Sequence, residues 1–214
     1  MQNFIKVDSP LVKHYISVIR DKNSNKNEFS DGIENLVYLM LPQITNGLML
    51  SETRINTPLT ETSGYFFADK VLLIPVLRAG LAMLDPIKKI IPQTAVGYIG
   101  MRREESGKTI TAEMYYENLP PNLDSYKIML LDCIIATGVS LIHTIKHLID
   151  KGANQKNISI VSIMMAQPGL DALLAEFPEI TIATCQVDEI LNEKGYIVPG
   201  LGDAGNRYNG YDIN

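Results

Sequence analysis

The residues with the clearest chemical potential lie in one segment, 127–140, with the sequence KIMLLDCIIATGVS. An apolar run, typical of a buried strand, stops at Asp132, and a Thr137–Gly138 turn then leads into a helical pattern. A helix start presents backbone N–H groups that bind phosphate, and Thr137 and Ser140 add hydroxyl donors. Asp132 can accept hydrogen bonds from sugar hydroxyls. The segment therefore predicts a sugar-phosphate cradle; the alternative is an ordinary helix cap beside a strand-end acid.

Arginines and a glycine-rich stretch form a second group of candidate residues. Arg78 follows another apolar run, and Arg102 and Arg103 stand together in GMRREES. A guanidinium binds phosphate oxygens in a planar, bidentate manner, and a protein of net charge −5 needs such local cations to hold an anion. The stretch GLGDAG, 200–205, fits the dinucleotide pattern G-x-G-x-x-G. Too little chain follows it for the helix and acid that this pattern requires, so we interpret it as another kind of ligand-binding turn.

The elements that must position these residues are read from hydrophobic periodicity. Two helices are expected in the first 50 residues. The first is capped by Asp8 or Ser9, starts at Pro10 and has one apolar face formed by Leu11, Val12, Tyr15, Ile16 and Ile19. The second has a possible capping box at Asp31 and Glu34 and should kink or end at Pro42.

Beyond residue 52, strands and helices alternate. Strands are predicted over 71–76, 94–101, 127–131, 158–166 and 180–185, and helices over 81–91, 141–149 and 169–177. This alternation predicts an α/β fold with a mainly parallel sheet covered on both faces. Ligands of such sheets bind beyond the carboxyl ends of the strands, where Arg78 and Asp132 are expected.

The composition of the chain argues against several classes of protein. Hydrophobic residues make up 46% and charged residues 20% of the 214 residues, which fits one globular domain and excludes a disordered chain. No apolar run is long enough to span a membrane, and the net negative charge argues against nucleic-acid binding. Cys133 and Cys185 lack metal-ligand spacing and are expected as free thiols in the cytoplasm. His143 and His147 have no third ligand in sight, so we expect a solvated polar helix face rather than zinc.

The cradle segment resembles the phosphoribosyl-pyrophosphate (PRPP) loop of type I phosphoribosyltransferases. Three further segments, PLVKHYISVIRDKN, VLRAGLAMLDPI and GYIVPGLGDAGNR, extend the resemblance to the uracil phosphoribosyltransferase family over about residues 6–207. It implies a mainly parallel twisted sheet flanked by helices, with a flexible β flap and a small C-terminal hood. All 214 residues would form one domain, with N-terminal helices over about 1–50, a flap segment over about 101–120 and a hood segment over about 187–214.

The resemblance also implies transfer of the 5-phosphoribosyl group from PRPP to N1 of uracil, giving UMP and diphosphate. Asp132, Arg103 and Asp203 would be the catalytic residues. Mg²⁺ would arrive with PRPP, near Asp203, rather than in a protein cage. Uracil would be read largely by main-chain groups at Ile197, Gly202, Asp203 and Ala204, and a tyrosine pair, Tyr115–Tyr116, matches the flap. The residues implied to bind PRPP are Arg78, Arg103, Asp132, Cys133, Ile134, Ile135, Ala136, Thr137, Gly138, Val139, Ser140 and Asp203.

Several residues depart from the family pattern. Cys133 and Ile134 replace a proline and a methionine, Val139 replaces a glycine, and Asn206 replaces an acid. They keep two alternatives open: a catalytically silent PRPP- or nucleotide-binding paralogue, and an RNA-binding regulator of pyrimidine operons on the same fold. The resemblance further implies a homodimer or homotetramer, in some members activated by GTP. The apolar face over 11–19 would either join such an interface or pack on the chain's own sheet.

Overall fold

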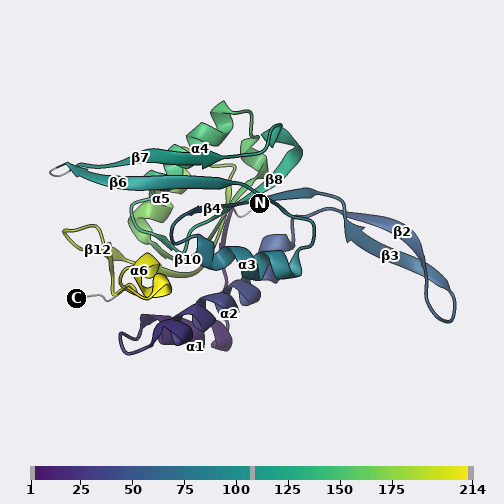
Figure 1. Cartoon of the computed structure of the whole chain (residues 1–214), viewed down its shortest axis with the longest axis horizontal. Helices are drawn as coiled ribbons and strands as arrows, with labels where there is room; N and C mark the ends of the chain where they lie inside the picture. Colours follow the sequence, from purple (N-terminus) through teal and green to yellow (C-terminus); the bar gives the residue numbers. More distant parts are fainter. Residues whose placement is uncertain (1–2, 107–108, 212–214) are drawn as a thin grey trace.

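The expected strands assemble into one twisted sheet (Figure 1). The structure, a computed structural model, describes residues 3–106 and 109–211, apart from the side chains of 103–106 and 109–111. Every neighbouring pair along the sheet is parallel except the last, β6 with β7, which is antiparallel. The prediction of a mainly parallel sheet is thereby confirmed. In spatial order the strands are β1 (Phe4–Lys6), β11 (Thr181–Asp188), β10 (Ile158–Ala166), β8 (Tyr126–Leu131), β4 (Lys70–Leu77), β6 (Tyr98–Ser106) and β7 (Thr109–Asn118).

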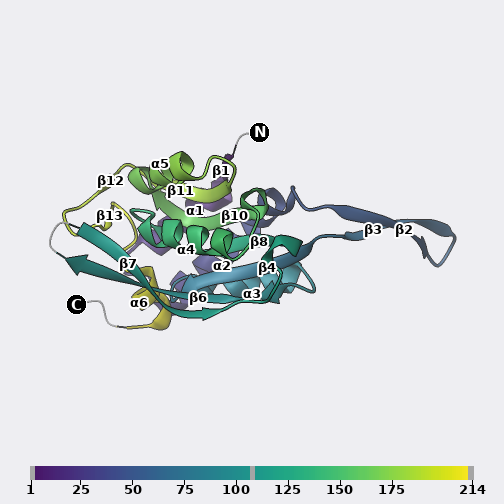
Figure 2. The same cartoon turned by 90° about the horizontal axis from the view of Figure 1, so that it is seen from above.

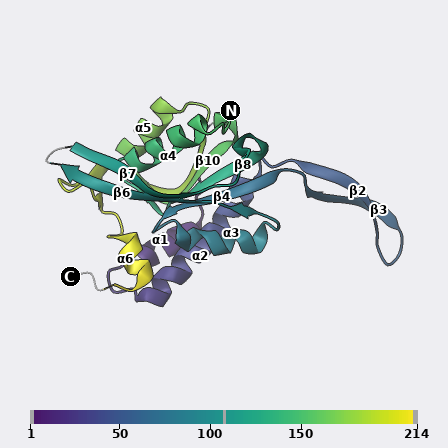
Figure 3. The ribbon, with the colours of Figure 1, turned by 45° about the horizontal axis from the view of Figure 1, so that its top comes forward.

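Helices cover both faces of this sheet because its central strands are apolar on both sides. Val71 and Leu73 of β4 point into one hydrophobic cluster, and Leu72 and Ile74 point into the other. The first cluster is closed by α1 (Pro10–Arg20), α2 (Lys26–Thr45) and α3 (Leu81–Ile90), and the second by α4 (Val139–Asp150) and α5 (Gln167–Glu176). Figure 3 shows these two layers on opposite sides of the sheet.

The N-terminal helices differ from the sequence prediction in detail. Ser9 caps α1, as one of the two expected candidates, but Leu11 is exposed and does not share the buried face of Val12, Ile16 and Ile19. The capping box of α2 lies at Asn25 and Glu28, so the prediction at Asp31 and Glu34 was wrong. α2 continues through Pro42 to Thr45, so the helix does not end at this proline.

A long hairpin over 50–67, here called the arm, was not predicted from the sequence. Its strands are β2 (Leu50–Asn56) and β3 (Glu61–Phe67), and the Thr57 hydroxyl accepts hydrogen bonds from the N–H groups of the turn. The arm projects from the body (Figure 2), and all its strand residues except Gly64 are exposed. Because no face of the arm is buried in the chain, its sequence lacks the alternation that marks a half-buried strand.

The remaining elements lie at the carboxyl edge and the chain ends. The strand expected over 94–101 is split at Gly97 into β5 (Ala95–Val96) and β6, and the strand expected to end at Cys185 continues to Asp188. Within the cradle segment, β9 (Ile134–Ile135) pairs with β10. The hood segment contains β12 (Ile190–Leu191), β13 (Ile197–Val198) and α6 (Ala204–Asn209). No helix in the described part of the chain is long and apolar enough to cross a membrane.

Candidate active site

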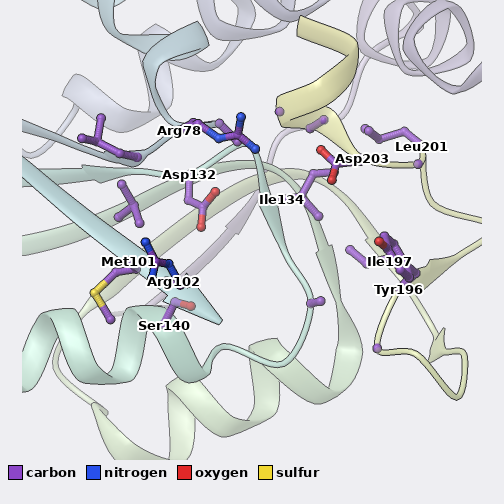
Figure 4. Close-up of a pocket in the computed structure, with 18 of the residues that line it drawn as sticks. Arg78, Met101, Arg102, Asp132, Ile134, Ser140, Tyr196, Ile197, Leu201 and Asp203 are labelled. Atoms are coloured by element: carbon purple, nitrogen blue, oxygen red, sulfur yellow. The ribbon is translucent and has the colours of Figure 1, made fainter. Parts of the chain in front are cut away.

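A cavity of about 540 Å³ opens at the carboxyl edge of the sheet, between the ends of β4 and β8, the flap segment and the hood segment (Figure 4). This is the edge at which the alternation of strands and helices predicts a ligand. Nine of the residues expected to bind ligands line the cavity: Arg78, Asp132, Ile134, Ala136, Ser140, Ile197, Gly202, Asp203 and Ala204. Residues far apart in the sequence therefore meet around one volume.

The backbone of Asp132 is held by β10, the strand beside β8 in the sheet. Its N–H donates to the carbonyl of Val161 at 3.2 Å, and the next carbonyl, that of Cys133, accepts from Met164 at 3.1 Å. The Cys133 thiol donates to the carbonyl of Ala79 at 3.2 Å, which joins the cradle to the Arg78 loop. Burial, with a smaller effect of the Asp132 charge, raises the pKa of the Cys133 thiol, so this side chain is neutral.

The cradle then turns tightly into α4. Gly138 has φ +77°, and a Cβ there would lie 3.1 Å from the carbonyl oxygen of Gly169 at the start of α5. Val139 follows as the first residue of α4 and has no positive φ. Ala136 and Ser140 line the cavity, whereas Thr137, Gly138 and Val139 do not, nor do the buried Cys133 and Ile135. Sequence reasoning had placed all of these residues at the ligand.

Two arginines of the described residues face the cavity. Arg78 follows β4, and Arg102 extends from β6, with its guanidinium carbon 5.6 Å from the ring centroid of Tyr115. Figure 4 shows the side chains of both arginines near Asp132, on its two sides. The side chain of Arg103, the expected second PRPP arginine, lies outside the described residues. The arrangement gives an anionic ligand two guanidinium partners.

Part of the lining was not assigned from the sequence. Tyr196 and Gly195 precede the expected Ile197, and Met101 precedes Arg102. These residues carry no distinctive chemical signal, because apolar and aromatic side chains are mostly core residues. Their adjacency to assigned residues was the only available clue. The rest of the lining includes Arg102 and Tyr115, which were candidates as a cation and as part of the tyrosine pair of the flap, together with Val76, Leu77, Ala79, Leu201 and Gly205.

Asp203 both faces the cavity and caps α6. Its Oδ1 accepts from the backbone N–H of Asn206 at 2.8 Å. Because Asn206 contributes its main chain to this contact, the replacement of an acid at that position leaves the cap intact. Arg207 donates to the carbonyls of Leu201 at 2.9 Å and Asp21 at 2.7 Å and also contacts the carbonyl of Ile19. The hood segment is thereby attached to the end of α1.

A second attachment holds the start of the glycine-rich stretch. Arg20, the last residue of α1, donates to Asp188 at 2.6 Å and to the carbonyl of Gly200 at 3.1 Å. Asp188 accepts from the N–H of Gly200 at 3.0 Å and from the Gln186 amide at 3.0 Å. Burial raises the pKa of Asp188, but the hydrogen bonds from Arg20, Gly200 and Gln186 outweigh it, so the net pKa lies below the ordinary aspartate value.

The carboxylates of the cavity suit a metal ion that is held mainly by a bound phosphorylated substrate. Asp132 and Asp203 both line the volume. Among the described residues, no group of three or more His, Cys, Asp and Glu side chains could form a metal cage. Mg²⁺ prefers carboxylate, phosphate and water oxygens and is commonly bound by one or two carboxylates plus a substrate phosphate. This donor set therefore fits Mg²⁺ that enters with a phosphorylated ligand.

Solved structures share the fold of this chain. A hypoxanthine phosphoribosyltransferase from Staphylococcus aureus shares the fold, with a TM-score of 0.52 at 13% identity over 76% of each chain. A protein from Aquifex aeolicus superposes over 99% of this chain and 100% of its own, with a TM-score of 0.89 and 27% identity. The sheet, with its cradle at the carboxyl edge, is that of the type I phosphoribosyltransferases.

Sequence relatives narrow this class. The family model described as uracil phosphoribosyltransferase matches residues 6–210, and the chain belongs to that family. Uracil phosphoribosyltransferases of Campylobacter fetus and Thermosipho melanesiensis are similar to it, at 38% identity over 207 residues and 40% over 202 residues. The first alignment covers 97% of each chain, and the second covers 94% of this chain and 95% of the relative.

Proposed function

We propose that the protein transfers the 5-phosphoribosyl group of PRPP to N1 of uracil, giving UMP and diphosphate for pyrimidine salvage. The observation that carries this proposal is the single cavity in which Arg78, Asp132, the start of α4 and the hood segment meet. Family membership over residues 6–210 supports the same reaction.

The reaction breaks the bond between C1 of the ribose and the diphosphate oxygen, and the electron pair leaves with the diphosphate. A bond forms between C1 and uracil N1, and the N1 proton is released to solvent water. Positive charge develops on the ribose and negative charge on the leaving group, so catalysis rests mostly on positioning and charge stabilisation. Arg78 holds the diphosphate, with Arg103 as the second cationic contact, and Mg²⁺, when bound, neutralises part of the diphosphate charge.

The cradle holds the rest of PRPP. The Asp132 carboxylate accepts hydrogen bonds from the ribose hydroxyls, and the N-terminal end of α4, with the Ser140 hydroxyl, binds the 5′-phosphate. Cys133, Ile134 and Ile135 carry the chain between these two contacts, pinned to β10. Thr137, Gly138 and Val139 act through their turn and their backbone N–H groups rather than as cavity walls.

The hood segment supplies the uracil site. Ile197, Gly202, Asp203 and Ala204 line the cavity, and their main-chain groups are the proposed contacts for uracil. A backbone carbonyl accepts from uracil N3–H, and a backbone N–H donates to O4. Cytosine presents the opposite pattern at both positions, so it leaves two groups poorly paired, and we expect strong discrimination against it.

The direct test is to incubate the protein with Mg²⁺, PRPP and labelled uracil and to quantify UMP and diphosphate. Equal amounts of the two products are expected, and none with cytosine. Folded protein that binds PRPP without forming UMP would establish the silent-paralogue alternative. A salt-sensitive shift of RNA on a gel, without UMP formation, would establish the RNA-binding alternative. Parallel assays with and without GTP test the expected activation.

We also propose that the protein is a homodimer or homotetramer and that the arm contributes to the contact. The buried face of α1 packs on α2 and contacts β11 of the sheet within the same chain, so we place the proposed contact on the arm rather than on this face. A two-stranded hairpin is marginally stable alone, and large exposed apolar patches mark interfaces. The exposed apolar side chains in and beside the arm are Met49, Leu50, Ile55, Leu59, Tyr65, Phe66 and Phe67.

A further inference from the structure

Glu117 joins the flap segment to the helix that starts at the cradle. Its carboxylate, on β7, lies 2.7 Å from the Lys151 ammonium and also contacts the imidazole of His147. His147 and Lys151 are four residues apart and therefore lie on one face at the C-terminal end of α4. The solvated polar face expected at His143 and His147 is found only at His143, which is exposed; the His147 side chain is two-thirds buried and contacts Glu117.

The ribbon formed by β6 and β7 is attached to the sheet by a short parallel pairing and by apolar packing at its base, where Met101 and Met114 lie against the core. β6 pairs with β4 through only two residue pairs, Val76 with Ile99 and Leu77 with Gly100. β7 is the outermost strand and pairs only with β6 among the described residues. The contact of β7 with α4 is therefore a further point of attachment for the ribbon, and Glu117 supplies its charged part.

The ribbon carries two cavity residues close to this attachment. Gly100 pairs with Tyr116 and Met101 with Met114, so Tyr115 is left without a partner in a β-bulge. A bulge changes the direction of a side chain, and here the Tyr115 ring lies over Gly100, where a Cβ would come within 2.6 Å of it. Arg102 then lies beside the same ring. The bulge is two residues from Glu117, so movement at Glu117 moves Tyr115 and Arg102.

We propose that Glu117 is a positioning residue for PRPP, which fixes the root of the flap segment on α4 and so sets Tyr115 and Arg102 against the cradle. This inference rests on the proposed function, because it assigns PRPP to the cavity. One wall, with Ser140, belongs to the N-terminal end of α4. A second part of the lining, with Met101, Arg102 and Tyr115, belongs to the ribbon, and the cluster of Glu117, His147 and Lys151 links the ribbon to the C-terminal end of the same helix.

An exposed ion pair elsewhere on α4 serves as a comparison for the Glu117 cluster. Lys146 contacts Glu176 of α5 at 2.6 Å, with side chains 55% and 44% exposed. Such pairs contribute little. Glu117 is less exposed, has two partners, and reaches a strand instead of a neighbouring helix. Burial raises the pKa of Glu117, but the contacts with Lys151 and His147 outweigh it and hold the pKa below the ordinary glutamate value.

The test compares Glu117→Gln and Lys151→Met with Lys146→Met as the matched control. For both cluster variants we expect the KM and the calorimetric Kd for Mg²⁺–PRPP to rise about three- to tenfold, with the uracil KM within about twofold of wild type. Exchanging the charges, with Glu117→Lys and Lys151→Glu in one chain, should recover most of the loss. Lys146→Met should change none of these values.

Unchanged PRPP affinity in a folded Glu117→Gln protein would overturn the proposal. So would an equal loss in Lys146→Met, since a general effect on α4 would then explain the result. The calorimetric measurement of PRPP binding separates this proposal from the proposed function. Wild-type protein that binds PRPP but forms no UMP contradicts the function, whereas the positioning role is still decided by the affinities of the variants.

Discussion

The guanidinium of Arg20 and the carboxylate of Asp188 form an ion pair at 2.6 Å that joins the end of α1 to the end of β11. Between them they bind both main-chain polar groups of Gly200, which is 180 residues from Arg20 in the sequence. The position of the proposed uracil site therefore depends on side chains that do not touch the cavity. Arg20 and Asp188 are positioning residues in this sense.

Removing the Asp188 charge should loosen the hood segment. Asp188→Asn leaves the partly buried guanidinium of Arg20 without a counter-charge, which costs about 3–5 kcal/mol in comparable buried pairs. We expect a lower urea midpoint and a raised KM for uracil, with the KM for PRPP changed much less. Arg54→Met, which breaks an exposed pair with Glu61 in the arm, is the control and should leave both constants unchanged.

The same ion pair should give the protein a specific acid sensitivity. The pKa of Asp188 is below its ordinary value in the folded protein, so its stabilisation is complete above about pH 4 and is lost as pH falls through the folded-state pKa. Below about pH 4 the free energy of unfolding of wild type should therefore fall more steeply than that of Asp188→Asn. Parallel slopes in urea titrations across this range would contradict the assignment.

Arg78→Ala should weaken PRPP far more than uracil. A charge-assisted hydrogen bond contributes about 1.5–3 kcal/mol, which corresponds to about ten- to a hundredfold in the KM for PRPP. Steady-state kinetics with each substrate varied in turn provide the measurement. An unchanged KM for PRPP together with an unchanged turnover would refute the role of Arg78 in binding diphosphate.

Val139→Gly should change PRPP binding little. Val139 is the first residue of α4, has no positive φ and does not line the cavity, so its side chain does not obstruct the cradle. The glycine should loosen the helix start by up to about 1 kcal/mol, seen as a lower thermal midpoint. A tenfold gain in PRPP affinity would show instead that the valine obstructs the site, and the silent-paralogue alternative would then be favoured.

Asn206→Asp, which restores the acid of the family pattern, should leave activity within about threefold of wild type. The contact of Asn206 with Asp203 is made by its backbone N–H, which the substitution keeps, and an acid in the first turn suits the helix dipole. The kcat and both KM values give the measurement. A gain of tenfold or more would mean that the asparagine side chain limits the reaction.

Polar substitutions in the arm should dissociate the oligomer. Tyr65→Ser combined with Phe66→Ser removes two exposed aromatic side chains that we assign to the proposed partner contact. We expect light scattering to give a multiple of 23.8 kDa for wild type and a shift towards 23.8 kDa for the variant. Leu11→Ser, at an exposed position of α1, is the control. A monomeric wild type at micromolar concentration would contradict the proposal.

The sequence by itself determined the features that are encoded in contiguous residues. A run of apolar residues ending at Asp132, a Thr137–Gly138 turn and a helical repeat specify strand, loop and helix locally, and the same holds for Arg78 after β4. The alternation of such units specified a mainly parallel sheet, and hence the edge where the site lies. These predictions succeeded because hydrogen bonding and burial in a central βα unit follow from nearby residues.

Only the tertiary structure decided which distant residues meet. The contacts of Arg20 with Gly200 and of Glu117 with His147 depend on strand order and on helix faces, neither of which leaves a pattern at the residues concerned. The direction of Tyr115 depends on a bulge whose register is set across two strands. The arm escaped prediction for the opposite reason: nearly all of its strand residues are exposed in the part of the chain that the structure describes, and strand periodicity arises only where one face is buried.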